Sequence, residues 1–241
     1  MCVIFFALGH HAEHPLILLA NRDEFYRRPT EPARRWTDHP EITAGRDLAA
    51  GGTWLGVTDA GRFAAVTNYR EPQAPKGVVS RGNLVANFLR SDETTASYLR
   101  HIQESAGDYS GFNLIVGEIS DQRRELYHFS NRGDAMRELE PGVYGLSNHL
   151  LDSSWPKVAA GKRRFAELIA ERAVSKEKCF RLLADETVAE DAELPDTGVG
   201  LERERTLSPI FIRTPVYGTR SSTVLIFDQD SSWELEEKVF V

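Results

Sequence analysis

The sequence of 241 residues predicts an α+β fold built from layered sheets. Strand-like runs occupy both ends of the chain, and two blocks of helical periodicity lie between them. The chain is also long enough to bury a core without help from disulfides or metals. No repeat, low-complexity tract or convincing boundary divides it, so we expect one domain over residues 1–241.

Two hairpins are expected near the start of the chain. Apolar runs at residues 2–8 and 16–20 are separated by a polar turn with glycine and proline, which is typical of two buried strands. Runs at residues 53–58 and 62–68 flank Asp59-Ala60-Gly61, which favours a second hairpin. Further runs predict strands at residues 112–119, 125–129, 143–146, 210–213, 222–228 and 233–241.

Helical periodicity occurs in two blocks. In the first, apolar residues repeat at helical spacing over residues 84–89 and 98–102, with a break near 91–92, which predicts two short helices. The second block opens at Trp155-Pro156, where proline suits the first turn of a helix. A shorter helix is expected near residues 179–183.

Composition excludes several classes of function. A net charge of −7 and a pI of about 5.6 argue against a nucleic-acid or anionic-membrane partner. No apolar run approaches the roughly 18 residues of a membrane span, and the first residues make a poor signal peptide. Only Cys2 and Cys179 are present, which favours a reducing, cytoplasmic setting. Residues 185–205 carry eight acidic side chains, and we expect a solvated loop there.

Cys2 is the first candidate for chemistry. Removal of Met1, which proceeds when the second residue is small, would leave Cys2 with a free α-amine. A thiol with a pKa near 8.5 beside an amine with a pKa near 7.7–8.0 combines a nucleophile and a general base in one residue. The alternative is that Cys2 is a small apolar residue that opens a buried strand.

The polar residues Asn21-Arg22-Asp23-Glu24 come directly after the second apolar run. If that run pairs with the first, its end returns to Cys2. Arg22 would then lower the pKa of the thiol, and Asp23 would accept a hydrogen bond from the α-ammonium group. The alternative is a polar strand end whose arginine pairs with a surface carboxylate.

Three further segments place small polar residues at predicted strand ends: residues 67–69, 146–149 and 217–223. Side-chain amides such as those of Asn68 and Asn148 can donate to a developing oxyanion, although asparagine is also a common turn residue. Other motifs fit less well. Gly51-Gly52-Thr53 lacks the ending of a phosphate-binding loop, and the three histidines of residues 10–14 have no further ligand at metal-binding spacing.

Taken together and in order, these motifs resemble the NRDE, or transport and Golgi organisation, family over nearly the whole chain. The segments that carry the resemblance are Met1-Cys2-Val3-Ile4-Phe5-Phe6, Ala20-Asn21-Arg22-Asp23-Glu24-Phe25-Tyr26-Arg27-Arg28-Pro29, Gly51-Gly52-Thr53-Trp54-Leu55-Gly56, Thr67-Asn68-Tyr69, Gly111-Phe112-Asn113-Leu114, Tyr144-Gly145-Leu146-Ser147-Asn148 and Gly218-Thr219-Arg220. The family in turn resembles N-terminal nucleophile (Ntn) hydrolases of the penicillin acylase and bile-salt hydrolase branch. The resemblance therefore implies a four-layer αββα sandwich.

The resemblance also implies roles for six residues. Cys2 would be the nucleophile, Arg22 would tune its thiolate, and Asp23 would hold the α-amine. Asn68 and Asn148 would be partners of the oxyanion or the amine. Arg220 would be a structural or substrate-side cation.

Two functions follow from the resemblance. In one, the protein hydrolyses the linear amide bond of a small acylated substrate through a thioester at Cys2, and no cofactor is needed. In the other, the same cleft carries a hydrophobic ligand such as haem or acyl-CoA without turnover.

Overall fold

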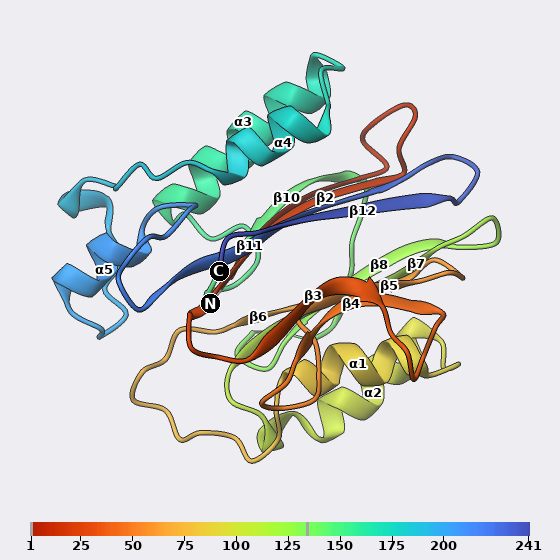
Figure 1. Cartoon of the computed structure of the whole chain (residues 1–241), viewed down its shortest axis with the longest axis horizontal. Coiled ribbons are helices and arrows are strands. Elements are labelled where there is room, and N and C mark those ends of the chain that lie inside the picture. The colour runs from red at the N-terminus through yellow and green to blue at the C-terminus, as the bar shows by residue number, and fades with distance from the viewer. Residues whose placement is uncertain (1, 134) are drawn as a thin grey trace.

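A computed structural model describes residues 2–133 and 135–241 of the chain. Two antiparallel sheets face each other, and helices pack on the outer face of each sheet (Figure 1). The layers therefore follow the order α, β, β, α. The predicted α+β class and the four-layer sandwich implied by the resemblance are both confirmed.

The first sheet is built around the hairpin predicted at the start of the chain. Its strands, in spatial order, are β10 (Gly142–Leu146), β1 (Cys2–Leu8), β2 (Leu16–Phe25), β11 (Tyr217–Phe227) and β12 (Trp233–Val239). Phe6 and Leu18 lie in the core between the sheets, whereas Phe5 and Leu19 lie in the core beneath the outer helices. Because both faces of β1 and of the first half of β2 are buried, these segments are continuous apolar runs in the sequence.

The second sheet contains the other predicted hairpin. Its strands, in order, are β3 (Thr30–Arg35), β4 (Ile42–Asp47), β5 (Leu55–Thr58), β6 (Arg62–Asn68), β7 (Phe112–Ile119), β8 (Arg124–Ser130) and β9 (Arg137–Glu138). Phe63 faces the first sheet, and Phe112 faces the helices on the other side. Strands β3 and β4 were not predicted, because β3 is half polar and lies at the sheet edge.

The helices follow the predicted periodicity. They are α1 (Gly82–Arg90) and α2 (Thr95–Glu104) on the second sheet, and α3 (Pro156–Ala170) and α4 (Lys176–Leu183) on the first (Figure 1). The side chains of Thr94 and Ser175 cap α2 and α4 by accepting hydrogen bonds from backbone N–H groups, and Pro156 opens α3. Within the described ranges, no helix is long and apolar enough to cross a membrane.

One prediction near the C-terminus is wrong, and another is incomplete. Residues 210–213 form no strand, although residues 210–212 are buried and Arg213 makes a single bridge to Gly218. Residues 185–205 are not simply a solvated loop, because they contain a short 3₁₀ helix (Asp191–Glu193) and most of α5 (Leu201–Leu207). Glu204 on α5 is only 3% exposed. A buried carboxylate of this kind depends on a distant cation, which local sequence does not reveal.

Strand β2 extends further than predicted. It runs to Phe25, so residues 21–24 lie within the strand and not after it. Alternation then divides them between the two faces of the sheet. Arg22 points toward the second sheet, where it meets Trp54, and Asn21 points toward the helices, where its Nδ2 donates to Leu183 O and Ile210 O.

Candidate active site

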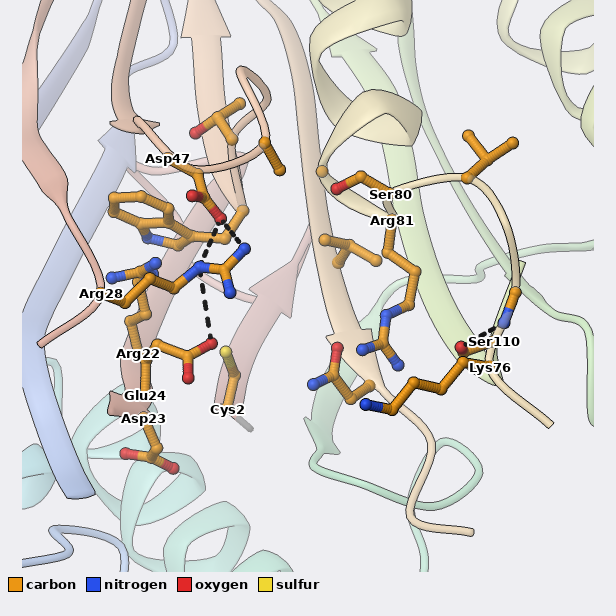
Figure 2. Close-up of a pocket in the computed structure, with 18 of the residues that line it drawn as sticks. Cys2, Arg22, Asp23, Glu24, Arg28, Asp47, Lys76, Ser80, Arg81 and Ser110 are labelled. Carbon is orange, nitrogen blue, oxygen red and sulfur yellow. Dashed lines mark hydrogen bonds and ion pairs between the residues drawn. The ribbon is translucent and has the colours of Figure 1, made fainter. Parts of the chain in front are cut away.

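Cys2 begins β1 at the edge of a cavity of about 420 Å³, which we call the Cys2 cavity. The cavity lies between the ends of β1 and β2 and the connection from β6 to α1 (Figure 2). In the β1–β2 ladder, Cys2 is directly opposite Arg22, as the sequence predicted. A hydrogen bond also fixes the start of β1, because Ser147 Oγ donates to the backbone oxygen of Cys2 at 3.0 Å.

Opposing effects act on the pKa of the Cys2 thiol. Burial raises the pKa of the thiol above its ordinary value, and the charge of Asp23 acts in the same direction. The positive charge of Arg22 and the backbone N–H of Asp23 oppose that rise. Burial therefore favours the protonated thiol, and attack requires a base to remove its proton. Met1, whose removal would supply the α-amine, lies outside the described residues.

Arg22 is held rigidly beside the thiol. Its guanidinium carbon lies 3.9 Å from the centre of the Trp54 ring, and its Nη1 donates to Thr30 Oγ1 at 3.2 Å. Burial lowers the pKa of Arg22, whereas a thiolate at Cys2 and the carboxylate of Glu24 favour its charged form. Arg22 can therefore stabilise negative charge on the sulfur without changing position.

Asp23 belongs to a buried set of charges on the helix side of β2. Its Oδ1 accepts a hydrogen bond from Thr219 Oγ1 at 2.7 Å, and burial raises its pKa against the opposing charge of Lys157. Lys157 lies on α3, where its Nζ donates to Leu207 O at 2.8 Å, and burial lowers its pKa to about 8. Arg70 pairs with Glu204 of α5. We call Asp23, Lys157, Arg70 and Glu204 the inner cluster.

The two candidate asparagines have different positions. Asn68 ends β6 and lines the Cys2 cavity. Asn148 is fully buried and does not line it; its Nδ2 donates to Asn68 O at 2.9 Å, and its own backbone oxygen accepts from Arg70 N at 2.8 Å. Asn148 thus fixes the backbone that carries Asn68. Its side chain is committed to that contact and does not enter the cavity.

Arg220 also lies outside the Cys2 cavity. The pairing of β11 with β2 shifts between Thr219 and Ser221, so Arg220 is the extra residue of a β-bulge. Its guanidinium donates to the backbone oxygens of Phe25, Arg28 and Val241 beside a separate small cavity. Of the two roles implied by the resemblance, this geometry fits a structural cation.

Several residues of the cavity were not singled out in the sequence. Arg28 and Asp47 form an ion pair at 2.8 Å on the Cys2 side, and Lys76 and Arg81 lie opposite (Figure 2). The glycine pair at 51–52 also has a purpose. A Cβ on Gly52 would lie 2.5 Å from the backbone carbon of Gly82, so glycine lets α1 begin against this turn.

The histidines of residues 10–14 lie apart from the Cys2 cavity and form no metal cluster with other described residues. Among the described residues no group of three or more histidines, cysteines or carboxylates could hold a metal ion. His11 and His14 stack with ring centres 4.7 Å apart, and His14 Nδ1 lies 2.7 Å from Asp228 Oδ1. These histidines follow the end of β1 opposite to Cys2, so they are remote from the cavity.

The layer order and the position of Cys2 at the start of β1 are those of an Ntn-hydrolase-like fold. The structure is similar over 100% of its length to 97% of the C2A mutant of a conjugated bile acid hydrolase from Clostridium perfringens, with a TM-score of 0.52 and 7% identity. At that identity the likeness establishes the fold alone.

The chain belongs to the transport and Golgi organisation 2 family, whose model matches residues 1–241. It is 37% identical over 257 residues to the transport and Golgi organization protein 2 homolog of Bos taurus, covering 99% of this chain and 92% of the relative. It is 30% identical to the transport and Golgi organization protein 2 of Drosophila melanogaster, with the same coverage.

Proposed function

We propose that this protein is a cysteine Ntn amidohydrolase that cleaves the linear amide bond of a small acylated substrate. One observation carries the proposal. The Cys2 thiol opens onto a cavity large enough for a small ligand, and Asn68 lines the same cavity. Arg22 is directly opposite Cys2 in the β1–β2 ladder. A strand that only needed a small apolar residue at this position would not require a buried arginine beside it.

The reaction balances with the residues of this site. After Met1 removal, the α-amine of Cys2 takes the thiol proton, and the sulfur attacks the amide carbonyl carbon. The carbonyl oxygen becomes an oxyanion that the Asn68 side-chain amide stabilises. The C–N bond then breaks, the leaving amine takes the proton, and an acyl thioester remains on Cys2. Water attacks the thioester, which releases the carboxylic acid and restores the thiol.

Arg22 and Asp23 support different parts of this reaction. Arg22 stabilises the thiolate, because its cation is fixed between Trp54 and Thr30. Asp23 orients the α-ammonium group, and the hydrogen bond from Thr219 keeps its carboxylate in place. In the reducing cytoplasm that we expect for the enzyme, both cysteines remain free thiols, as they are in the structure.

Transport of a hydrophobic ligand such as haem or acyl-CoA is the alternative that the family resemblance raises. A carrier cavity of this kind is lined mainly by apolar side chains. The described lining of the Cys2 cavity instead includes Arg22, Arg28, Asp47, Lys76 and Arg81, and no histidine. No specific observation therefore favours the carrier over the hydrolase.

The test begins with the intact mass of the protein purified from its native host. We expect the mass to lack one methionine. In a second measurement, the same protein should hydrolyse N-octanoyl amides. Cys2→Ala should lower kcat by at least about 1,000-fold. Cys179→Ala is the matched control, because that thiol is buried in the core beneath the helices, and it should retain activity.

Two results would contradict the proposal. One is turnover that survives Cys2→Ala. The other is an active enzyme that retains Met1, since the base would then be tied up in a peptide bond. A variant with leucine inserted between Met1 and Cys2 prevents methionine removal and should be inactive.

A further inference from the structure

The two walls of the Cys2 cavity differ in charge. The wall with Cys2 carries Arg22 and Arg28, and it also carries the carboxylates of Asp23, Glu24 and Asp47. The opposite wall is formed by the connection from β6 to α1 and by Ser110 (Figure 2). Its lining includes Lys76, Ser80, Arg81 and Ser110, and no acidic residue among those described. We call these four residues the cationic wall.

On the Cys2 side, Arg28 is paired with carboxylates, and Arg22 stacks on an aromatic ring. Arg28 lies 2.8 Å from Asp47 Oδ2 and 3.9 Å from Glu24 Oε2. Arg22 is stacked on Trp54 and faces the thiol. Both arginines therefore already have partners within the site: carboxylates for Arg28, and Trp54 and the thiol for Arg22.

The cations of the cationic wall are not compensated in this way. Among the described residues, neither Lys76 nor Arg81 has a carboxylate within ion-pair distance. Arg81 is anchored by one hydrogen bond, from its Nη1 to Gly111 O at 3.0 Å. The nearby carboxylate of Glu71 is engaged by Arg132, at 2.6 and 2.8 Å. Most donors of the Arg81 guanidinium therefore remain available to a ligand.

The backbone adds to this positive field. Helix α1 begins at Gly82, which also lines the cavity, and its first turn has no acidic residue and no capping side chain. Ser80 and Arg81 precede that helix start, so the positive end of the helix dipole and the Arg81 side chain lie at the same wall. Burial lowers the pKa of Arg81, whereas a thiolate at Cys2 and the carboxylates of Glu24 and Glu71 favour its charged form. These groups therefore lie within electrostatic range of Arg81.

We infer that the cationic wall binds an anionic group of the substrate, with Arg81 as the main donor and Lys76 as a second charge at the cavity mouth. The ligand is a small amide that carries a carboxylate, sulfonate or phosphate. This inference rests on the proposed function only in taking an acyl amide as the ligand. The anion would orient the scissile bond toward Cys2 and would make neutral amides poorer ligands.

The test measures binding to Cys2→Ala protein by calorimetry, so that no turnover is needed. The probes share an octanoyl chain: N-octanoylglycine, N-octanoyltaurine and N-octanoyl phosphoethanolamine against neutral N-octanoylglycinamide. The monoamide of octanedioic acid carries its anion on the acyl side instead. The probe that binds most tightly identifies both the kind of anion and the side of the amide that carries it.

We expect at least one anionic probe to bind about 10- to 100-fold more tightly than the neutral amide, as for a charge-assisted hydrogen bond. Arg81→Met should remove most of this preference, Lys76→Met should reduce it, and Arg81→Lys should restore part of it. Arg100→Met is the matched control, since Arg100 is exposed on α2 away from the cavity, and it should change nothing.

Failure of this inference and failure of the proposed function give different results. Equal binding of all probes, absence of binding, or a preference that survives both Arg81→Met and Lys76→Met would overturn the anion site even if the wild-type protein hydrolyses amides. A preference lost in Arg81→Met would establish the site even if no amide is hydrolysed.

Discussion

The inner cluster and the cationic wall lie on different sides of the end of β2, and their charges are arranged in opposite ways. Behind β2, Asp23 faces Lys157, and Arg70 pairs with Glu204, so every buried charge has an opposing one nearby. Across the cavity, Lys76 and Arg81 line the wall, and neither forms an ion pair with a carboxylate among the described residues. Buried charges must be compensated within the fold, whereas charges that are left open are available for a ligand.

This comparison suggests that the two regions contribute to different properties. The inner cluster should determine stability and the position of Asp23, since its other members, Lys157, Arg70 and Glu204, do not line the Cys2 cavity. The cationic wall should determine which ligand binds and contribute little to stability. Four substitutions test this separation, from the largest expected effect on the free energy of unfolding to the smallest.

The largest effect is expected from Glu204→Gln. This change leaves the buried Arg70 guanidinium without its anion, which costs about 3–5 kcal/mol in comparable buried pairs. The free energy of unfolding in urea measures it. Glu202→Gln is the matched control, because Glu202 is exposed on the same helix, and it should cost less than about 0.5 kcal/mol. Similar losses in the two variants would show that the ion pair does not hold α5.

An intermediate effect is expected from Lys157, and it depends on pH. Burial lowers the pKa of Lys157 from 10.5 to about 8 in the folded protein. Between these values the unfolded chain binds more protons at this residue than the folded chain does. The contribution of Lys157 to stability therefore rises with pH over this window, by about 3 kcal/mol in total.

The measurement compares urea unfolding of the wild type and Lys157→Met from pH 7 to pH 10. The difference in stability between them should shift in favour of the wild type as the pH rises. Lys178→Met changes an exposed lysine of α4 and should show no such slope relative to the wild type. A flat difference for Lys157→Met would mean that Lys157 keeps an ordinary pKa in the folded protein.

The smallest effects are expected at the cationic wall. Lys76→Met should change the free energy of unfolding by less than about 0.5 kcal/mol, because Lys76 is exposed. Arg81→Met should cost about 1 kcal/mol, the net value of its hydrogen bond to Gly111 O. Thermal unfolding of both variants checks this. A loss as large as that of Glu204→Gln would mean that this wall, too, is part of the structural framework.

Much of the fold could be predicted from local patterns. The apolar runs of β1 and β2 are buried on both faces, so they stand out as strands, and their hairpin register brings Arg22 opposite Cys2. The helices of both blocks were predicted for the same reason, since each buries an apolar stripe. Strands β3 and β4 have no such signal because polar or small residues fill much of both.

The positions of Asn148 and Arg220 could not be predicted in the same way. Their motifs give the order along the chain but not the direction of each side chain. Asn148 is turned into the contact with Asn68 O, and a β-bulge turns Arg220 toward the backbone oxygens of Phe25 and Arg28. A bulge depends on the pairing of two strands that are distant in sequence, and no local pattern in β11 predicts it.

The sequence by itself determined the layered α+β architecture, the family, and the placement of a thiol beside an arginine, because these depend on alternation, helical period and short ordered motifs. The tertiary structure alone decided which charges are compensated. Glu204 lies 134 residues from its partner Arg70 along the chain, and Arg81 lines the same cavity as Cys2 although the two are far apart in the sequence. Compensation of charge is a property of distances in space, which sequence order does not contain.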